Sequence, residues 1–552
     1  MSPAEAYRVG TQAFSAGQFD VALRYLRSIQ QAQALHLAAV SAQKLGQTDA
    51  AAELFGQALK LGPNDPNIAN NYGHFALAIG DDVLALRQFE SALKHAPNFA
   101  PALIGVAKVR AAQKDWSEAE VAWRKVLTVS NKSIAGRYGL ATALLESGAA
   151  EEADALFQSL LTENNSPELR FMLGRTHLEQ NRLESAEQLF ASSYAQAPTD
   201  YALRNLANLY WMQGATDKFT ALVNHAPAAL REVAIRLVIE SGDIDRSEAM
   251  WRSAYAEGNP DKAAWLLRAS IAREAQNAAD LAVATEHALQ LDPTDLVALD
   301  LRIVADLMLG DAEQALTRLK PLRQAYPNGQ HWLAHEFVAL RMLGQVSNLH
   351  SVDRYVRAYD LAPPAGFESM EAFNQNFVET LQQLHCFSAR PLNQSLRGQG
   401  TQTTRSLTSY EHPVIRAYIE ALDAPIQQYL TEIGQDPGHP TSARNKGDYS
   451  FAGMWSVRLR GQGFHERHVH PEGWISSAYY VAVPPGTDQS AEQAGWIGFG
   501  APPYQVPRAA DELKWIAPKA GRVVLFPSFM WHGTKPIKDD AERITAPFDL
   551  LP

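Results

Sequence analysis

Alanine and aromatic residues recur along roughly the first 350 residues of this chain at a spacing near 34. Successive alanines are 34, 34, 34 and 33 residues apart, and an aromatic residue follows each of them four residues later. These residues are Ala51, Ala85, Ala119, Ala153 and Ala186, followed by Phe55, Phe89, Trp123, Phe157 and Phe190. A small residue where two helices touch, with an aromatic residue one helical turn later, predicts repeated pairs of amphipathic helices. Unrelated amphipathic helices would not keep these two positions in phase over five units.

Turn-forming residues keep the same spacing and divide the pattern into units. Glycines mark most of the turns, Asp115, Asn181 and Asn277 occupy equivalent places, and prolines close several units. The glycines are Gly46, Gly80, Gly148, Gly214, Gly310 and Gly344, and the prolines are Pro63, Pro97, Pro198, Pro293 and Pro327. The pattern resembles the tetratricopeptide repeat. We expect about ten units over 1–361, including weaker ones near 228–260 and 330–361.

The resemblance implies that neighbouring units stack to form the core, because no single unit can bury its apolar face alone. Such arrays bind extended segments or other proteins on their concave face. The interpretation therefore favours a protein or peptide partner for the array. A surface for dimerisation, or a rigid spacer, is the alternative. Neither the oligomeric state nor the partner follows from the sequence.

A different pattern begins after Pro363-Pro364-Ala365-Gly366, which breaks the helical periodicity and marks the expected boundary. Amphipathic helices are predicted over 367–384 and 413–433. We assign 362–450 to this boundary and to helices that support a sheet, and 451–552 to the sheet itself. The Gly-rich insertion at 484–507 is too long for a hairpin turn and is expected to line the mouth of a pocket.

Histidines near the C-terminus are the strongest candidates for chemistry. His468 and His470 are two residues apart, so on a strand both side chains would point to one face. His532 comes 62 residues after His470 and follows the apolar run 523–526, which is typical of a buried strand. Three such ligands would leave open positions on a non-heme iron. A rival pair is His470 with Glu472, and His465 is expected to be a pocket or surface residue.

The segment from about 391 to 552 resembles the 2-oxoglutarate/Fe(II)-dependent oxygenases of double-stranded β-helix fold. The resemblance rests on PLNQSLRGQGTQT, GQGFHERHVHP, SSAYY, GRVVLFPSFMWH and the closing ERIT, in that order. In that family a His-x-Asp or His-x-Glu pair and a distal histidine hold the iron, so this chain differs by carrying His470 at the carboxylate position. An arginine followed two residues later by Ser or Thr binds the far carboxylate of 2-oxoglutarate, and Arg543 and Thr545 match these positions.

The resemblance implies a multidomain protein, an all-α tetratricopeptide solenoid followed by an α+β double-stranded β-helix (jelly-roll) domain. It implies a dioxygenase that uses Fe(II), 2-oxoglutarate and O2, with His468, His470 and His532 as catalytic metal ligands. Hydroxylation of a protein or peptide side chain recruited by the array is the expected activity. An oxygenase acting on a free small molecule and a non-catalytic scaffold with a degenerate barrel are the alternatives.

Composition excludes several other classes. The net charge of −11 argues against a nucleic-acid surface, which would show a basic patch. The single cysteine, Cys386, cannot form an intrachain disulfide and indicates a reducing compartment. No run of 18 apolar residues predicts a membrane span, and the first residues do not resemble a signal peptide. We therefore expect a cytoplasmic protein with no nucleic-acid partner.

Overall fold

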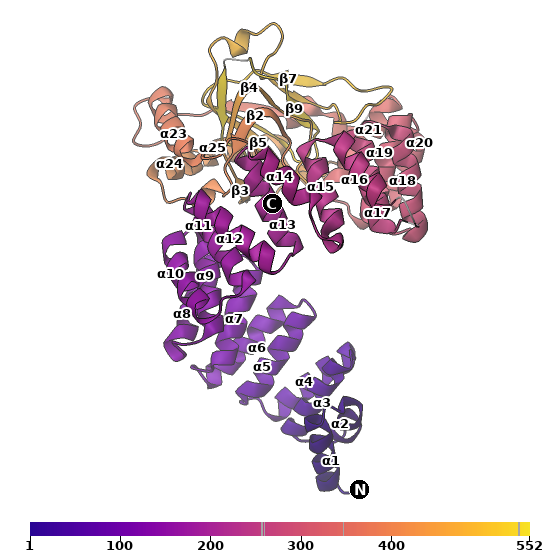
Figure 1. Cartoon of the computed structure of the whole chain (residues 1–552), viewed down its shortest axis with the longest axis vertical. Coiled ribbons are helices and arrows are strands. Elements are labelled where there is room, and N and C mark those ends of the chain that lie inside the picture. Colours follow the sequence, from indigo (N-terminus) through magenta and orange to yellow (C-terminus); the bar gives the residue numbers. More distant parts are fainter. Residues whose placement is uncertain (256–257, 259, 346, 539–540) are drawn as a thin grey trace. The chain divides into compact units, whose positions relative to one another are not determined.

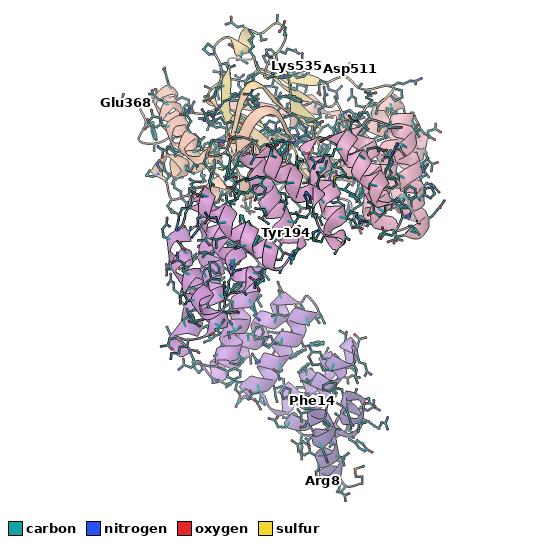
Figure 2. All side chains as sticks on the ribbon, in the orientation of Figure 1. Arg8, Phe14, Tyr194, Glu368, Asp511 and Lys535 are labelled. Carbon is teal, nitrogen blue, oxygen red and sulfur yellow. The ribbon has the colours of Figure 1, made fainter. Side chains whose placement is uncertain are left out.

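The computed structural model of the chain describes residues 1–255, 258, 260–345, 347–538 and 541–552. It divides into two compact units, Met1–Ser193 and Tyr194–Pro552. Tyr194, labelled in Figure 2, is the first residue of the second unit. The division falls inside a helix of the repeat array, so the second unit contains both helical repeats and the sheets. Within the described residues, no helix is both long enough and apolar enough to cross a membrane.

The first unit is built from consecutive antiparallel helix pairs (Figure 1). These helices are α1 (Pro3–Ser15), α2 (Phe19–Leu26), α3 (Ala32–Lys44), α4 (Thr48–Leu61), α5 (Pro66–Ala78), α6 (Asp82–His95), α7 (Ala100–Ala112), α8 (Trp116–Val129), α9 (Ile134–Ser147), α10 (Ala150–Glu163), α11 (Pro167–Glu179) and α12 (Leu183–Gln196). The periodic alanines and phenylalanines are fully buried, as the sequence predicts. A Cβ added at Gly73 or Gly105 would lie 2.6 or 2.5 Å from the ring of Phe89. This ring therefore packs directly against the backbones of α5 and α7.

The turns within the helix pairs require a residue in the left-handed region of φ. Gly46 and Gly80 have φ of 71° and 79°, and the equivalent residue 34 positions later is Lys114, with φ of 58°. The spacing of the turn residues predicts Asp115 in this turn. Asp115 is instead the N-cap of α8, where its side chain accepts a hydrogen bond from the Glu118 backbone.

The second unit continues the helical array. Its helices are α13 (Asp200–Met212), α14 (Thr216–Asn224), α15 (Arg231–Ser241), α16 (Ile244–Ala254), α17 (Lys262–Glu274), α18 (Ala278–Leu291), α19 (Leu296–Leu309), α20 (Ala312–Ala325), α21 (Gln330–Met342) and the single turn α22 (Val352–Tyr355). A full helix pair was expected near 330–361. The structure has α21 there without a second long helix, and strand β1 follows at Arg357–Asp360. Because β1 pairs with strand β8, the sheet begins before the expected boundary at 363–366.

Antiparallel sheets form the C-terminal part of the second unit. Their strands are β1, β2 (Leu396–Gln402), β3 (Ser450–Met454), β4 (Val457–His465), β5 (Ile475–Ala482), β6 (Ile497–Phe499), β7 (Lys514–Ile516), β8 (Arg522–Pro527), β9 (His532–Thr534), β10 (Glu542–Thr545) and β11 (Phe548–Leu551). The large sheet has the order β1-β8-β5-β10-β4-β2, and β11 joins β5 to β3. The small sheet has the order β7-β6-β9. The chain is therefore an all-α repeat array followed by a β-rich domain with its own helices.

Three helices cover the large sheet. Helix α23 (Met370–Leu384) buries Phe373, Phe377 and Leu381 as the sequence predicts. The single helix expected over 413–433 is two helices, α24 (Pro413–Ala421) and α25 (Asp423–Ile433). Pro425 explains the break, because proline has no N–H to donate to the carbonyl four residues earlier and its ring crowds that carbonyl.

The last repeat helices and the small sheet share one hydrophobic core. Leu333, Phe337 and Val338 of α21 belong to the same buried cluster as Phe526 of β8 and Trp531, which precedes β9. The indole Nε1 of Trp531 donates to the carbonyl of Ala334 at 3.1 Å. The Arg341 guanidinium donates to the carbonyls of Gly500 at 2.6 Å and of Asp511 at 2.9 Å, and Asp511 is labelled in Figure 2. The helices α17–α21 and the β-rich domain are thus one folded body.

Candidate active site

Backbone pairing brings the distant histidines together. The N–H of His468 donates to the carbonyl of His532 at 2.9 Å, and the N–H of His532 donates back at 3.1 Å. The N–H of His470 then donates to the carbonyl of Ser528 at 3.0 Å. The two histidines were expected on one strand, but β4 ends at His465, and His468 forms only an isolated bridge with His532. The segment 464–470 nevertheless places the imidazoles of His468 and His470 on the same side of the backbone, with their Nε2 atoms 3.2 Å apart.

The three imidazole rings form a compact group. The ring centres of His468 and His532 are 4.2 Å apart, those of His468 and His470 are 5.0 Å apart, and those of His470 and His532 are 5.2 Å apart. One nitrogen from each ring lies within 4.8 Å of the other two. His532 is buried, while His468 and His470 are half-buried and line a cavity.

Hydrogen bonds determine which nitrogen of each ring carries the proton. Nδ1 of His468 lies 2.8 Å from the Glu466 carbonyl, and Nδ1 of His532 lies 3.0 Å from the Met530 carbonyl. Nδ1 of His470 lies 2.6 Å from a carboxylate oxygen of Asp549. A carbonyl oxygen can only accept, so the Nδ1 atoms donate, and each neutral ring keeps its lone pair on Nε2.

These Nε2 lone pairs face one another. The Nε2 atoms of His468 and His470 are 3.2 Å apart, with no proton between them when both rings are neutral. Burial, and then the neighbouring His470, lower the pKa of His468 to about 3. Burial also lowers the pKa of His532 well below its usual value. Imidazoles whose lone pairs converge in this way could hold a metal ion, since a cation between them would remove their mutual repulsion.

The sequence offers Glu472 as a rival ligand and predicts His465 to be a pocket or surface residue. Glu472 lines the same cavity, but its side chain is exposed and it does not belong to the histidine cluster. His465 also lines the cavity, and its Nδ1 lies 3.3 Å from the Ser395 hydroxyl. The geometry therefore favours the pair His468 and His470 over the rival pair with Glu472.

Arg543 is buried in the wall of the same cavity. It lies on β10 opposite Leu459 of β4, and only 2% of its surface is exposed. One guanidinium nitrogen donates to the Gly495 carbonyl at 2.7 Å, while Nε has no partner among the described residues. Burial lowers the pKa of the Arg543 guanidinium, and no described acidic side chain forms an ion pair with it. A buried arginine without an acid beside a cavity is suited to the carboxylate of a ligand.

Thr545 and Tyr480 lie close to this arginine. Thr545 is two residues further along β10 and also lines the cavity. The Tyr480 ring lies 6.0 Å from the guanidinium carbon of Arg543. Burial raises the pKa of Tyr480 to about 12, so its hydroxyl stays protonated, and this hydroxyl has no partner among the described residues. Arg543 and Tyr480 thus offer two unsatisfied donors to one cavity.

The cavity has a volume of about 460 Å³, large enough for a small diacid with room beside it. It holds all five residues that the sequence predicted for the site: His468, His470, His532, Arg543 and Thr545. Asp549, Tyr480 and Gly495 were not predicted. A buried acid within the apolar strand FDLL was a signal for Asp549, whereas the carbonyl of Gly495 belongs to the insertion and gave no signal.

Comparisons with known families agree with both parts of the chain. Residues 453–549 match the family described as "Putative 2OG-Fe(II) oxygenase". Residues 36–86 and 138–201 match the tetratricopeptide repeat family. The chain thus carries tetratricopeptide repeats and a domain of this oxygenase family. No curated protein sequence matches the chain significantly.

Several solved structures of tetratricopeptide repeat proteins are similar to part of the chain. A tetratricopeptide repeat protein from Parabacteroides merdae is 16% identical over 55% of this chain and 98% of its own, with a TM-score of 0.30. YrrB, a TPR protein with an unusual peptide-binding site, is 23% identical over 32% of this chain and 91% of its own, with a TM-score of 0.28. A thermophilic TPR protein of Thermus thermophilus is 22% identical over 33% of this chain and 99% of its own, with a TM-score of 0.27.

Proposed function

We propose that this chain, which carries tetratricopeptide repeats and a 2OG-Fe(II) oxygenase domain, is a dioxygenase that hydroxylates a side chain of a protein or peptide. The observation that supports this most is the convergence of three Nε2 lone pairs, each fixed by a hydrogen bond at Nδ1. Three nitrogen lone pairs that point to one place are suited to bind a cation.

His468, His470 and His532 would hold the iron. Imidazole is an acceptable ligand for Fe(II), and three protein ligands leave positions free for other groups. When bound, Fe(II) would supply the centre at which O2 is activated with electrons from 2-oxoglutarate. The chain's own contribution is orientation, because the Glu466 carbonyl, the Met530 carbonyl and the Asp549 carboxylate keep each ring in one tautomer.

Arg543 would bind the carboxylate of 2-oxoglutarate that lies far from the metal, with Thr545 assisting. A guanidinium can form two parallel hydrogen bonds to a carboxylate, and its charge is otherwise uncompensated in this cavity. The Tyr480 hydroxyl is a further donor on the same wall. Desolvation makes these hydrogen bonds stronger than they would be in water.

A protein or peptide substrate agrees with the repeats, which generally mediate binding of polypeptides. The single cysteine, Cys386, cannot form an intrachain disulfide, which suits the cytoplasm as a reducing compartment.

The proposal is tested by incubating the full chain with Fe(II), 2-oxoglutarate and a cell lysate, followed by mass spectrometry of the proteins and metabolites. We expect a protein that gains one oxygen atom with the native chain and does not gain it with His532→Ala or without 2-oxoglutarate. Oxygen gained by a metabolite alone would favour a small-molecule oxygenase. No 2-oxoglutarate-dependent gain in any molecule would favour a non-catalytic scaffold.

A further inference from the structure

Three cavities of the second unit lie next to one another, and the three histidines line the first of them. The cavity with the histidines is called the metal cavity. A second cavity of about 440 Å³, called the repeat cavity, shares Asn393, Gln394, Ser395, His468 and Val469 with it. A third cavity of about 180 Å³, called the outer cavity, shares Glu240, Leu392 and Asn393 with the repeat cavity. Because neighbouring cavities share wall residues, the three lie in a row, and together they are called the cleft.

One side of this cleft is made by helices of the array. Arg204, Asn205 and Asn208 of α13 line the outer cavity, together with Leu237 and Glu240 of α15. The repeat cavity is lined by residues of α15, α17, α19 and α21, which are Ile239, Glu240, Arg273, Glu274, Asp300, Val304, His331 and His335. The odd-numbered helices from α13 to α21 therefore all contribute to this wall. The cleft thus runs along the direction in which the repeats are stacked.

The other side is the segment 392–395, which runs along all three cavities. The Leu392 N–H donates to the side-chain oxygen of Asn208 at 2.9 Å, and the Ser395 carbonyl accepts from the Glu466 N–H at 2.8 Å. The Arg390 guanidinium donates to the Glu240 carbonyl at 3.2 Å. The segment is thus fixed to α13 and α15 at one end and beside His465 and His468 at the other, which gives the cleft a preformed wall.

The arginines of the repeat cavity are already paired with acids. Arg397 lies 2.6 Å from Glu466, Arg467 lies 2.7 Å from Glu512, and Arg273 lies 2.7 Å from Glu274. The charges of these three arginines are therefore compensated within the protein.

Two acids in the cleft are not paired with lysine or arginine. The only ion-pair partner of Asp300 among the described residues is His335, at 3.1 Å, and the other ring nitrogen of His335 lies 2.9 Å from the Tyr504 hydroxyl. Glu240 forms no ion pair within the described part of the chain, and burial raises the pKa of its carboxyl group, while the nearby Arg204, Arg236 and Arg390 act in the opposite direction. Carboxylates that line the cleft without a lysine or arginine ion-pair partner favour a cationic ligand.

We propose that this cleft binds an extended polypeptide segment bearing a lysine or arginine side chain, which Asp300 and Glu240 receive while a neighbouring residue reaches the three histidines. The inference rests on the proposed function and names its substrate class. An extended chain fits because the cleft has three compartments in a row, whereas a free amino acid would fill one. The shared core of α17–α21 and the small sheet holds the walls of the cleft together.

The experiment measures binding by the full chain without requiring turnover. Dodecapeptide mixtures, randomised except for a central Lys, Gln or Glu, are passed over the immobilised chain, and the retained fraction is measured. We expect the Lys mixture to be retained at least about tenfold more than the other two, since a hydrogen bond to a charged group contributes about 1.5–3 kcal/mol. Asp300→Asn and Glu240→Gln should each reduce this preference, and Glu313→Gln, at an exposed acid of α20 outside the cleft, should keep it.

A bulky substitution tests whether the ligand is extended. Asn205 lies in the outer cavity, distant in sequence from the histidines, and Asn205→Trp should weaken retention of the Lys dodecapeptides while leaving retention of Nα-acetyl-lysine amide unchanged. Equal retention of the Lys, Gln and Glu mixtures would overturn the proposal, as would unchanged dodecapeptide retention by Asn205→Trp.

Two further outcomes separate this inference from its rivals. Asp300, His331 and His335 also have the residue types of a metal site. If Asp300→Asn removes one equivalent of bound Zn²⁺ and leaves the lysine preference intact, the cluster is a metal site and the proposal is wrong. If 2-oxoglutarate is converted to succinate but peptide retention shows no preference for lysine, only the cleft proposal fails. A lysine preference without any succinate formation would retain the cleft and reject the oxygenase.

Discussion

Nδ1 of His470 lies 2.6 Å from Oδ2 of Asp549, a residue 79 positions later in the chain. The carboxylate accepts the Nδ1 proton and so directs the Nε2 lone pair of His470 towards His468 and His532. The second carboxylate oxygen, Oδ1, is buried and has no partner among the described residues. His470 is therefore the hydrogen-bond partner of the buried Asp549 carboxylate, and this carboxylate in turn fixes the orientation of the His470 ring.

Removal of this carboxylate should weaken iron binding without removing a ligand. Outer partners of this kind contribute about 10- to 100-fold to metal affinity. We expect Asp549→Ala to lower the Fe(II) affinity by roughly that factor and Asp549→Asn, which keeps an acceptor oxygen, to lower it less. Isothermal titration with Fe(II) under anaerobic conditions measures both. Equal affinities for the native chain and Asp549→Ala would show that His470 does not need this partner or is not a ligand.

Substitution of the histidines should distinguish the two ligand assignments. His532→Ala and His468→Ala should each abolish stable Fe(II) binding, because two imidazoles hold a labile divalent ion poorly. Glu472→Gln is the matched control, since this exposed acid lines the cavity but lies outside the histidine cluster. Loss of iron in Glu472→Gln, with full binding in His468→Ala, would establish the rival pair His470 and Glu472.

The arginine substitution tests the co-substrate. Arg543→Ala should raise the KM for 2-oxoglutarate by roughly ten- to a hundredfold, because a buried charged hydrogen bond contributes about 1.5–3 kcal/mol. Arg543→Lys should recover part of this loss, since an ammonium group cannot make the paired contacts of a guanidinium. Arg416→Ala, at a surface ion pair of α24, is the control and should leave the KM unchanged. A KM unaffected in Arg543→Ala would mean that the co-substrate is bound elsewhere.

The shared core predicts where the chain can be shortened. A chain beginning at Pro364 would lack β1 and the helices that cover Phe526 and Trp531. We expect it to aggregate or to lack a cooperative thermal transition in circular dichroism. A chain beginning at Asp200 keeps these elements and should melt cooperatively. Cooperative melting of the shorter chain would show that the sheets do not need α17–α21.

Two buried histidines predict a loss of stability in acid. Burial lowers the pKa of His385 and of His439 from 6.5 to about 4. His385 bonds to the hydroxyls of Thr401 and Ser456 at 2.7 and 2.9 Å. As the pH falls below 6.5, these two histidines become protonated in the unfolded chain but stay neutral in the folded chain. The free energy of unfolding therefore declines between pH 6.5 and 4. The melting temperature of His385→Gln should depend less steeply on pH over this range, and identical slopes would contradict the assignment.

The repeats were predictable because their signal is periodic. One alanine and one aromatic residue recur at a fixed step, and the structure buries both, as at Ala85 and Phe89. The end of the array was less predictable, since β1 is only four residues long and its partner β8 lies more than 160 residues away. Local sequence contains no information on such a pairing.

In the site, too, the residues with a local sequence signal were predictable, and those placed by long-range pairing were not. His468, His470 and His532 carry a recognisable spacing, and Arg543 and Thr545 follow at the matching places. Tyr480 and Asp549 depend on which face of β5 and β11 points inward, which is fixed by long-range register. The repeat cavity was not predictable, because it requires α15–α21 to lie against 466–469, and this packing follows from the shared core.

The most direct test of the account is the conversion of 2-oxoglutarate to succinate by the full chain under air, measured with and without Fe(II). The account predicts succinate formation that requires Fe(II), disappears in His532→Ala, and in Arg543→Ala returns only at much higher 2-oxoglutarate. Succinate formation that is equally fast in His532→Ala, or absent from the native chain after one equivalent of Fe(II) has been shown to bind, would contradict it.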